Sequence, residues 1–428
     1  KVLMLVHTFP PFGSVGGSIR LLKYLNFMSR ENGWKPTVIT IDPSIDLLWV
    51  SKHAHHSLEQ IPDDVKLILT NTGEFKDLNY SNKGLSALLR KLKLAVLWPI
   101  RKFFLIPDDK KLWCHELEKA ALQELNSDDY SLIYATAPPF SVLLTATKLK
   151  EKTGLPLVFD VKDDWAVPEN FTKLKRFRKG IEAKLEHKCV AAADKLIAVT
   201  QRSLDDHKAR HPNVADKFEL IHNGCDISEY KPYWDQPPAK FEKFTLIHTG
   251  IFSSKRDLTH LFHALRRLID EQKNETDTIE FVLIGKVPAA QAKVIRELGL
   301  AEAVRNLDYL ERDLYVQTLT KAHLPVVINY DVPTLIPGKL YEYWGSRNRM
   351  LLLDRREGAA ADLVHKYDLG SVVSPDDEDS IYNCIRNAYL AWQDGNLAPV
   401  DVSGLAEFDR RFLTGKLEKV FEEVMQYR

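Results

Sequence analysis

The sequence predicts an α/β protein made of two halves, each a parallel sheet flanked by helices. Short apolar, β-branched runs recur between longer stretches with helical spacing, which is the alternation that βαβ units produce. The chain has 428 residues, and at roughly 150 residues per domain it has room for two or three domains. Because 45% of the residues are hydrophobic, each half can bury a core of its own.

The apolar runs that we expect to form strands fall into two series. The first series lies at residues 2–6, 37–41, 65–69, 132–135, 157–160 and 195–199. The second series lies at residues 244–248, 280–284, 324–328, 350–353 and 370–373. Each run is followed by a turn or by residues with helical periodicity, so both series predict parallel sheets with crossover helices.

A proline-rich segment at residues 230–238, YKPYWDQPP, separates the two series. Proline fixes φ and lacks an N–H group, so we expect neither helix nor strand in this segment. We therefore expect one domain at residues 1–232 and a second at residues 233–405. Residues 406–428 have apolar side chains at helical spacing, which predicts a final helix that closes back toward the first domain.

Composition and charge argue against several classes of protein. Lys plus Arg is 59 and Asp plus Glu is 59, for a net charge of zero, so we expect no nucleic-acid partner. The cysteines Cys114, Cys189, Cys225 and Cys384 are far apart, which argues against a disulfide framework or a zinc knuckle and favours a cytoplasmic setting. No run reaches the roughly 18 apolar residues that span a bilayer, so we expect a soluble or peripheral protein.

A glycine turn follows the first strand of each series. Residues 8–20 read TFPPFGSVGGSIR and residues 247–257 read IHTGIFSSKRD, and both lead into a helical pattern. Glycine lets backbone N–H groups approach an anion at a helix N-terminus, and Lys255 and Arg256 can clamp a diphosphate. A simple turn before a helix, and a solvated basic pair beside Asp257, are the alternative interpretations.

A third segment, residues 333–344 with the sequence PTLIPGKLYEYW, follows a strand of the second half. It places Lys339 and Glu342 on a helix that we expect to begin near Gly338. Exposed backbone donors, a lysine for phosphate and a glutamate for a sugar hydroxyl together would make a nucleotide-sugar site. The alternative is that Glu342 is a surface residue, as a single glutamate in a helix usually is.

Six motifs along the chain occur in a fixed order after successive strands. They are Pro10-Pro11 with Gly16-Gly17, Ala137-Pro138-Pro139, Asp160 through Trp165, Ile221 through Asp226, Gly250 through Arg256, and Lys339 through Tyr343. The GT-B glycosyltransferases of family 4 have these motifs in the same order, and the chain resembles that family over nearly its full length. The resemblance implies two Rossmann-like domains facing each other across a cleft.

The resemblance also assigns roles to residues. The candidate donor-binding residues are Gly16, Gly17, Gly250, Lys255, Arg256, Gly285, Lys286, Leu310, Gly338, Lys339, Leu340 and Glu342. Arg256 matches the residue that neutralises the donor diphosphate, and Glu342 matches the glutamate that holds the donor ribose. Lys162 and Asp163 join Arg256 and Glu342 as candidate catalytic residues. Lys162 and Asp163 would position the acceptor or, alternatively, form an ion pair with each other that orders their loop.

Three positions depart from the family's pattern. Thr334 stands where the family has the first glutamate of a pair, Ile251 where an arginine often follows the glycine, and Lys162 where many members have a histidine. The donor sugar is therefore left open. Thr334 and Ile251 also keep open a catalytically silent relative that binds a nucleotide sugar or a partner. A nucleotide-sugar epimerase is a second alternative with the same fold, and it would need a carboxylate and a histidine for acid/base catalysis, which the sequence does not evidently place.

The reaction that the resemblance implies is retaining transfer of a hexosyl or N-acetylhexosaminyl group from a UDP- or GDP-sugar. Such a reaction needs positive charge at the diphosphate as the anomeric carbon becomes cationic. Arg256, Lys339 and the helix N-terminus near Gly338 would supply that charge, so we expect no metal and no other cofactor. The sequence shows no evident cluster of Asp or His with metal-ligand spacing.

Two basic stretches in the first half suggest where the acceptor comes from. Residues 83–113, KGLSALLRKLKLAVLWPIRKFFLIPDDKKLW, interleave basic and aromatic residues, and residues 173–179 are again basic. This pattern suits an anionic membrane surface, although a core helix with a solvated face shows it too. We expect peripheral docking on the inner face of the plasma membrane, with a glycan or lipid-linked glycan acceptor in bacterial-type surface polysaccharide synthesis.

Overall fold

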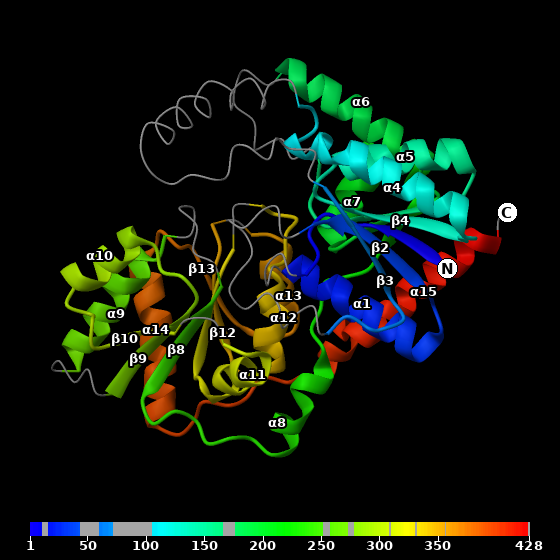
Figure 1. Cartoon of the computed structure of the whole chain (residues 1–428). Coiled ribbons are helices and arrows are strands. Elements are labelled where there is room, and N and C mark those ends of the chain that lie inside the picture. The colour runs from blue at the N-terminus through cyan, green and yellow to red at the C-terminus, as the bar shows by residue number, and fades with distance from the viewer. Residues whose placement is uncertain are drawn as a thin grey trace, which may run out of the picture. The chain divides into compact units, whose positions relative to one another are not determined.

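The computed structural model describes residues 1–10, 16–42, 60–71, 105–165, 176–250, 257–272, 278–307, 310–329, 332–355 and 357–426. Figure 1 shows the course of the chain. The chain divides into two compact units. Unit 1 is Lys1–His222 with Thr414–Arg428, and unit 2 is Asn223–Leu413.

Unit 1 contains a seven-stranded sheet in the order β3-β2-β1-β4-β5-β6-β7, in which all pairs are parallel. The strands are β1 Val2–Leu5, β2 Pro36–Ile41, β3 Lys66–Thr70, β4 Leu132–Ala137, β5 Leu157–Val161, β6 Lys195–Ala198 and β7 Phe218–Leu220. Every residue of β1, β2, β4 and β5 is buried, because helices cover both faces of a parallel sheet.

The helices of unit 1 cover both faces of this sheet. They are α1 Gly16–Asn32, α4 Trp113–Ser127, α5 Ser141–Thr153, α6 Arg176–Ala192, α7 Gln201–Arg210 and α15 Arg410–Gln426, with the 3-10 turns η3 Asp109–Lys111 and η6 Pro212–Lys217. Apolar residues of α4, α5 and α6 form one core cluster with the sheet. On the other face Phe421 of α15 contacts the rings of Tyr134 and Trp34, with centroids 5.6 and 5.4 Å away.

Unit 2 contains a six-stranded parallel sheet in the order β10-β9-β8-β11-β12-β13. The strands are β8 Phe244–Thr249, β9 Ile279–Ile284, β10 Val304–Leu307, β11 Leu324–Ile328, β12 Met350–Leu353 and β13 Gly370–Val373. The helices are α8 Lys231–Asp235, α9 Thr259–Glu271, α10 Ala289–Glu297, α11 Arg312–Lys321, α12 Gly338–Gly345, α13 Ala359–Lys366 and α14 Glu378–Gln393, with the 3-10 turns η7 Ile227–Glu229 and η9 Ser403–Phe408. Helices α9 and α14 lie side by side over one face, and α11, α12 and α13 cover the other (Figure 1).

The two parallel sheets confirm the predicted fold class. Every expected apolar run forms a strand, and the structure adds two strands that the sequence analysis missed, β7 and β10. Both are edge strands, and β10 has two exposed residues, Arg305 and Asn306. An edge strand is not covered on all sides, so it need not be a continuous apolar run.

The structure corrects the expectation for the proline-rich segment. Residues 231–235 form the short helix α8, with Pro232 in its first turn, where the missing N–H has no partner to lose. Tyr230 is fully buried, and the indole Nε1 of Trp234 donates to the carbonyl of Gly345 at 2.7 Å. The segment therefore packs within unit 2, and the division between the units falls at residues 222/223 instead of 232/233.

The final helix begins later than expected. Residues 403–408 form η9, and α15 starts at Arg410. Thr414–Arg428 is grouped with unit 1, so the prediction that the C-terminal helix returns to the first domain is confirmed. The boundary lies at residues 413/414 instead of 405/406.

Most of the basic and apolar segment expected at residues 83–113 lies outside the described residues, as do residues 173–175 of the second basic stretch. Within the part of the chain that the structure describes, no helix is both long enough and apolar enough to cross a bilayer. Arg178, in the second stretch, donates from Nε to Glu182 Oε1 and from a terminal nitrogen to the carbonyl of Pro107, each at 2.6 Å. Its guanidinium is thus held by unit 1 itself.

Candidate functional site

Two glycines lie at the carboxyl ends of neighbouring strands in unit 2. Gly250 follows β8 with φ at 117°, and Gly285 follows β9 with φ at 127°. The Gly250 N–H donates to the carbonyl of Ile284 at 2.8 Å, and a Cβ atom on Gly285 would lie 2.6 Å from the Gly250 oxygen. Only glycine accommodates both the positive φ and this close approach. The two predicted residues are therefore brought together.

Helix α12 begins at Gly338, as predicted, beside the end of β8. Lys339 Nζ donates to the carbonyl of Thr249, the residue before Gly250. Leu340 is fully buried, and Lys339 is only partly exposed. The helix N-terminus and one ammonium group therefore lie next to the glycine turn, which is the arrangement that suits an anion.

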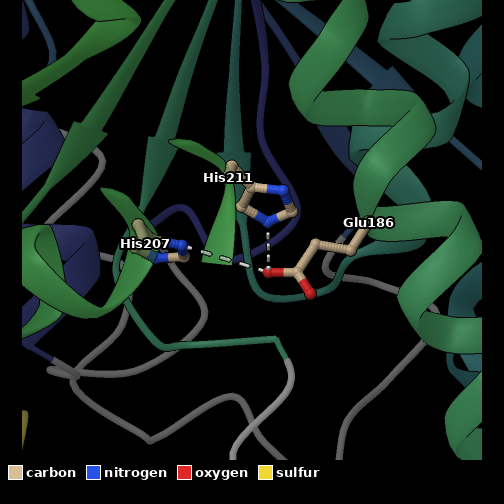
Figure 2. A group of neighbouring side chains, drawn as sticks. All are labelled: Glu186, His207 and His211. Atoms are coloured by element: carbon tan, nitrogen blue, oxygen red, sulfur yellow. Dashed lines mark ion pairs between the residues drawn. The ribbon is translucent and has the colours of Figure 1, made fainter. Parts of the chain in front are cut away.

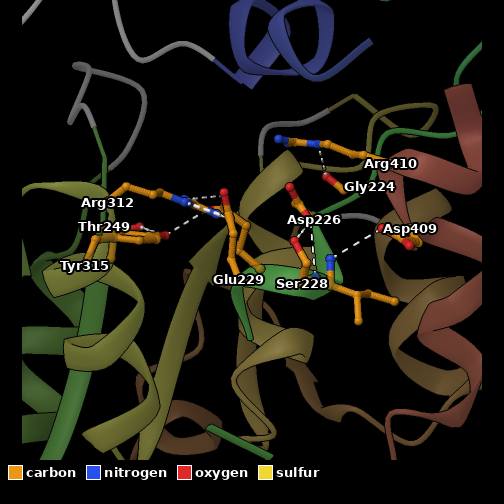
Figure 3. A network of polar contacts seen from close by, with 11 residues as sticks. Gly224, Asp226, Ser228, Glu229, Thr249, Arg312, Tyr315, Asp409 and Arg410 are labelled. Atoms are coloured by element: carbon orange, nitrogen blue, oxygen red, sulfur yellow. Dashed lines mark hydrogen bonds and ion pairs between the residues drawn. The ribbon is translucent and has the colours of Figure 1, made fainter. Parts of the chain in front are cut away.

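Glu342, also on α12, is held by two side chains of α11. Its Oε1 accepts from a terminal nitrogen of Arg312 at 2.9 Å, and its Oε2 accepts from the Tyr315 hydroxyl at 2.8 Å. Arg312 Nε also donates to Glu229 Oε2 at 2.9 Å (Figure 3). The Tyr315 hydroxyl lies 3.3 Å from the Thr249 hydroxyl (Figure 3). These contacts connect Lys339, through Thr249 and Tyr315, to Glu342 in one polar network.

The network fixes the charge of its members. Burial raises the pKa of Glu342, but the positive charge of Arg312, followed by that of Arg410, more than offsets this and the pKa is lowered. Burial, together with the charge of Glu342, raises the pKa of Tyr315 well above its usual value. Glu342 is therefore an anion and Tyr315 a neutral donor, and a carboxylate in this state has lone pairs left to accept sugar hydroxyls.

A second group of contacts holds the segment that carries Glu229. Arg410 Nε donates to the carbonyl of Gly224 at 3.0 Å, and the Asp226 carboxylate accepts from the backbone N–H of Ser228 at 3.1 Å (Figure 3). A Cβ atom on Gly224 would lie 2.0 Å from the Phe408 carbonyl oxygen, so this position too requires glycine. The motif at residues 221–226 thus has a structural role, and it leads the chain into η7.

A buried ion pair lies near the carboxyl end of strand β5 in the sheet of unit 1. Arg20 of α1 donates to Asp160 Oδ1 of β5 at 2.9 Å, and the Tyr134 hydroxyl donates to Asp160 Oδ2 at 2.6 Å. Arg20 also donates to the carbonyl of Ile221 at 2.9 Å. Arg20 and Asp160 are 3% and 2% exposed. The pair joins three segments and is out of reach of solvent, so its role is structural.

Lys162 and Asp163 follow β5. The Lys162 N–H donates to the carbonyl of Ala137 at 3.0 Å; Lys162 is partly exposed and Asp163 is exposed. Burial lowers the pKa of Lys162, an effect that the charge of Asp160 partly opposes. Within the described part of the chain no ion pair joins Lys162 to Asp163, so a backbone bond anchors this loop. Their role toward an acceptor stays a prediction.

Unit 1 has a pocket of about 490 Å³ at the carboxyl ends of β1 and β4. Its lining includes His7, Asp108, Lys110, Pro138, Pro139, Phe140, Trp165 and Arg178. The rings of Phe140 and Trp165 stack, with centroids 4.8 Å apart. Burial, with the charges of Lys110 and Lys162, lowers the pKa of His7 to about 3, so this imidazole is neutral at physiological pH.

The remaining predicted residues are placed as follows. Gly16 and Gly17 begin α1, Lys286 is exposed, and the partly buried Leu310 packs on the core cluster that contains α12. Lys255 and Arg256 lie outside the described residues. The sequence analysis missed Arg312, Tyr315 and Glu229, since Arg312 lies 83 positions from Glu229 and 30 from Glu342.

The sequence analysis also overlooked a cluster of possible metal ligands. Glu186, His207 and His211 are buried and offer ligand atoms that lie within 4.8 Å of one another (Figure 2). The signal was present in the sequence as two histidines four positions apart, a spacing that places both on one side of a helix. The expectation that sugar transfer needs no metal stays a prediction.

The comparisons with known proteins agree with this fold. Residues 63–229 match the family model described as Glycosyltransferase Family 4. The solved glycosyltransferase from Rickettsia africae is 12% identical, with a TM-score of 0.62, and the sucrose-phosphate synthase from Thermosynechococcus elongatus is 14% identical, with a TM-score of 0.65. WaaG, a glycosyltransferase involved in lipopolysaccharide biosynthesis, is 13% identical, with a TM-score of 0.60.

Each of these three alignments covers 100% of this chain and 99% of the other. No curated protein matches the chain in sequence. At such low identity the likeness to solved structures concerns the fold, which is the arrangement of two parallel sheets described above.

Proposed function

We propose that this chain is a GT-B glycosyltransferase that transfers a sugar from a nucleotide diphosphate sugar to a glycan or lipid-linked glycan. The match of residues 63–229 to the Glycosyltransferase Family 4 model and the fold shared with solved glycosyltransferases support the proposal. The observation that carries the proposal is the polar network of unit 2. It places the Lys339 ammonium and the Glu342 carboxylate on one helix, at the carboxyl end of the sheet.

The network suits the two polar parts of such a donor. Lys339 and the N-terminus of α12 carry positive charge next to Gly250, where a diphosphate would be neutralised. Glu342, kept ionised by Arg312, would accept hydrogen bonds from the ribose hydroxyls. Arg256, by the family resemblance, adds a second cation for the diphosphate. The base, of a UDP- or GDP-sugar, would lie near Gly285 and Leu310.

The reaction breaks the bond between the anomeric carbon and a diphosphate oxygen and forms a bond to an acceptor hydroxyl. Charge that develops on the departing diphosphate is stabilised by cations already in place, which lowers the barrier without a bound metal. We propose a retaining transfer in which the acceptor attacks from the leaving-group face. The departing phosphate oxygen then takes the acceptor's proton, and no protein nucleophile is needed.

The acceptor would bind at unit 1. The stacked rings of Phe140 and Trp165 in its pocket offer an apolar wall for a sugar ring, while Lys162 and Asp163 would orient the reacting hydroxyl. WaaG acts in lipopolysaccharide biosynthesis, and a comparable acceptor in surface polysaccharide synthesis would be lipid-linked. The basic residues at 83–113 would then hold the protein on an anionic membrane.

Slow donor hydrolysis tests the transferase proposal. The purified chain should release free sugar from a UDP- or GDP-sugar, and Arg256→Ala and Glu342→Gln should reduce the rate at least about tenfold, because each removes charge that contacts the donor. Glu302→Gln, at an exposed position of unit 2, is the matched control and should keep the wild-type rate. Nucleotide binding without turnover of any donor or acceptor would instead favour a catalytically silent relative.

Sedimentation with liposomes tests the membrane part on its own. Binding to vesicles that contain anionic lipid should be lost at high salt and weakened when Arg90, Lys91, Arg101 and Lys102 are neutralised. Neutralising Lys119 and Lys184, exposed lysines of α4 and α6, is the matched control. Equal sedimentation of the chain with neutral and with anionic vesicles would contradict membrane docking.

A further inference from the structure

A cluster of buried side chains in unit 1 joins α6 to the end of α7. Glu186 lies on α6, His207 lies on α7, and His211 follows α7 directly. The three residues are 4%, 3% and 8% exposed. Figure 2 shows both imidazole rings directed toward the Glu186 carboxylate, with His211 Nε2 at 3.6 Å and His207 Nδ1 at 4.0 Å from Oε1.

His211 is poorly satisfied in this arrangement. Neither of its ring nitrogens has a hydrogen-bond partner among the described residues, although the ring is almost completely buried. A buried polar group without a partner is unfavourable, and in native proteins such a group usually signals a bound water, a bound ion or a functional role. Two imidazoles and one carboxylate are also a ligand set that zinc accepts.

The surroundings of His207 match those of a metal ligand. Its Nε2 lies 3.1 Å from Asp164 Oδ1, close enough to donate after a small reorientation although the two are not aligned as a hydrogen bond here. Its Nδ1 lies 4.0 Å from Glu186 Oε1. Asp164 is in turn held by the Ser203 hydroxyl, which donates to Oδ1 at 2.6 Å. A carboxylate behind a ligating histidine orients the ring and raises its basicity, and this arrangement accompanies most histidine ligands of metals.

We propose that Glu186, His207 and His211 form a structural site for a divalent transition metal, with zinc as the best chemical match. Zinc would take one oxygen of Glu186, Nδ1 of His207 and Nε2 of His211, with water at the fourth position. Ligand atoms about 2.0–2.1 Å from a tetrahedral zinc are roughly 3.3 Å apart. The ligand atoms lie within 4.8 Å of one another here, so the side chains must move closer together when a metal binds.

Arg210 contacts two of the three proposed ligands and would have to move before a metal could bind them. One of its terminal nitrogens contacts Glu186 Oε1, and the other lies 3.0 Å from His207 Nδ1. The Arg210 side chain is 24% exposed, so it can swing toward solvent when a metal binds. Guanidinium and metal are alternative cations for the same carboxylate, and removal of Arg210 should make metal binding tighter.

The site would stabilise a loop near the candidate acceptor residues. Asp164 directly follows Lys162 and Asp163, and through His207 it connects that loop to α6 and α7. A bound metal would therefore fix the end of β5 relative to two helices. This role does not depend on the proposed sugar transfer, because it concerns how unit 1 is held together.

Metal analysis of the purified chain tests the proposal. After removal of metal with a chelator and reconstitution with Zn²⁺, elemental analysis should find about one equivalent per chain. Glu186→Gln and the double variant His207→Ala/His211→Ala should lose this metal, while His115→Ala, an exposed histidine of α4, should keep it. Co²⁺ in the same site should give the visible absorption of a tetrahedral complex.

Two further variants keep the test decisive if the histidine variants fail to fold. Asp164→Asn should weaken Zn²⁺ binding about 10- to 100-fold in a chelator competition, because the Asp164 carboxylate would orient the imidazole ring of His207. Arg210→Ala should bind Zn²⁺ more tightly than the wild type. The proposal is overturned if the wild-type chain takes up no metal, if Glu186→Gln takes up as much as wild type, or if Arg210→Ala binds no more tightly.

Discussion

The two units place charge differently at the carboxyl ends of their sheets. In unit 1 the Arg20–Asp160 pair is almost completely buried, with side chains 3% and 2% exposed. In unit 2 Arg312, Glu229 and Glu342 form a comparable set, with side chains 26%, 18% and 12% exposed. A charge that solvent cannot reach holds segments together, whereas a charge that remains accessible can also contact a ligand.

The pocket of unit 1 combines stacked aromatic rings with charged residues of its rim. Its stacked Phe140 and Trp165 rings present an apolar wall, and Arg20 is not among its lining residues. In unit 2 the partly exposed Lys339, Arg312 and Glu229 lie near the carboxyl end of the sheet, with Arg312 in contact with the buried carboxylate of Glu342. We therefore expect unit 1 to bind a sugar ring by its shape and unit 2 to bind a diphosphate by its charge.

Breaking the buried pair of unit 1 should have the largest effect. Arg20→Met leaves Asp160 as a buried carboxylate without its cation, and removal of one partner of a buried ion pair costs about 3–5 kcal/mol in free energy of unfolding. The loss in free energy of unfolding can be measured by urea unfolding, with hydrogen exchange of the amides of β1, β4 and β5 as the readout for unit 1. The double variant Arg20→Met/Asp160→Leu should recover most of it, and a loss below about 1 kcal/mol in the single variant would contradict a structural role.

Arg312→Met should have a smaller effect on stability and a larger one on ligand binding. The variant leaves the partly exposed Glu229 and the buried Glu342 without their cation. Because Arg312 and Glu229 are more exposed than Arg20 and Asp160, we expect a loss of about 1–3 kcal/mol. The pKa of Glu342 should rise, and nucleotide affinity should fall. Arg312→Lys keeps the charge without the planar fork and should be intermediate; full nucleotide affinity in Arg312→Met would contradict the network.

The acid sensitivity of unit 2 should depend on His323. Burial, with the charge of Lys240, lowers the pKa of His323 to about 4, and its Nδ1 accepts from the Thr245 N–H at 3.0 Å. The unfolded chain, with an imidazole pKa near 6.5, binds the proton first as the pH falls. The contribution of this histidine is therefore complete above pH 6.5 and is lost progressively toward pH 4.

Urea midpoints at pH 7 and pH 5 measure this dependence. His323→Gln, which keeps an acceptor for Thr245 but cannot take a proton, should lose less stability between the two values than the wild type. His365→Gln, at an exposed position of α13, is the control and should behave as the wild type does. An unchanged acid dependence in His323→Gln would show that other groups cause it.

An exposed ion pair should have the smallest effect. Arg305 and Glu280 make two hydrogen bonds between β10 and β9, at 2.5 and 3.1 Å, but the Arg305 side chain is 45% exposed. A double-mutant cycle of Arg305→Ala and Glu280→Ala should give a coupling energy of about 0.2–1 kcal/mol. A coupling as large as that of Arg20 and Asp160 would mean that burial does not decide the difference between the pairs.

Apart from the edge strands β7 and β10, the sequence predicted the strands of both sheets because buried parallel strands are short continuous apolar runs. It did not predict β10, whose exposed Arg305 and Asn306 interrupt such a run. It also did not predict α8, because Pro232 stands in the first helical turn, where a proline is tolerated.

The residues of the candidate site could also be predicted only in part. The glycine turns and Lys339 could be found from local spacing, since a glycine turn before a helix is a local pattern. The partners of Glu342 and Asp160 could not, because Arg312 is 30 positions from the first and Arg20 is 140 positions from the second. Which distant charges meet is decided by the packing of the sheet and its helices.

Calorimetric titration of nucleotides into the chain tests the central claim, that unit 2 binds a diphosphate by its positive charge. We predict that UDP or GDP binds more tightly than the corresponding monophosphate, and that Arg256→Ala removes this difference while Glu342→Gln weakens both. Arg296→Ala, an exposed arginine of α10, should change neither. Equal affinity of the wild-type chain for the monophosphate and the diphosphate, or no binding of either nucleotide, would contradict the account.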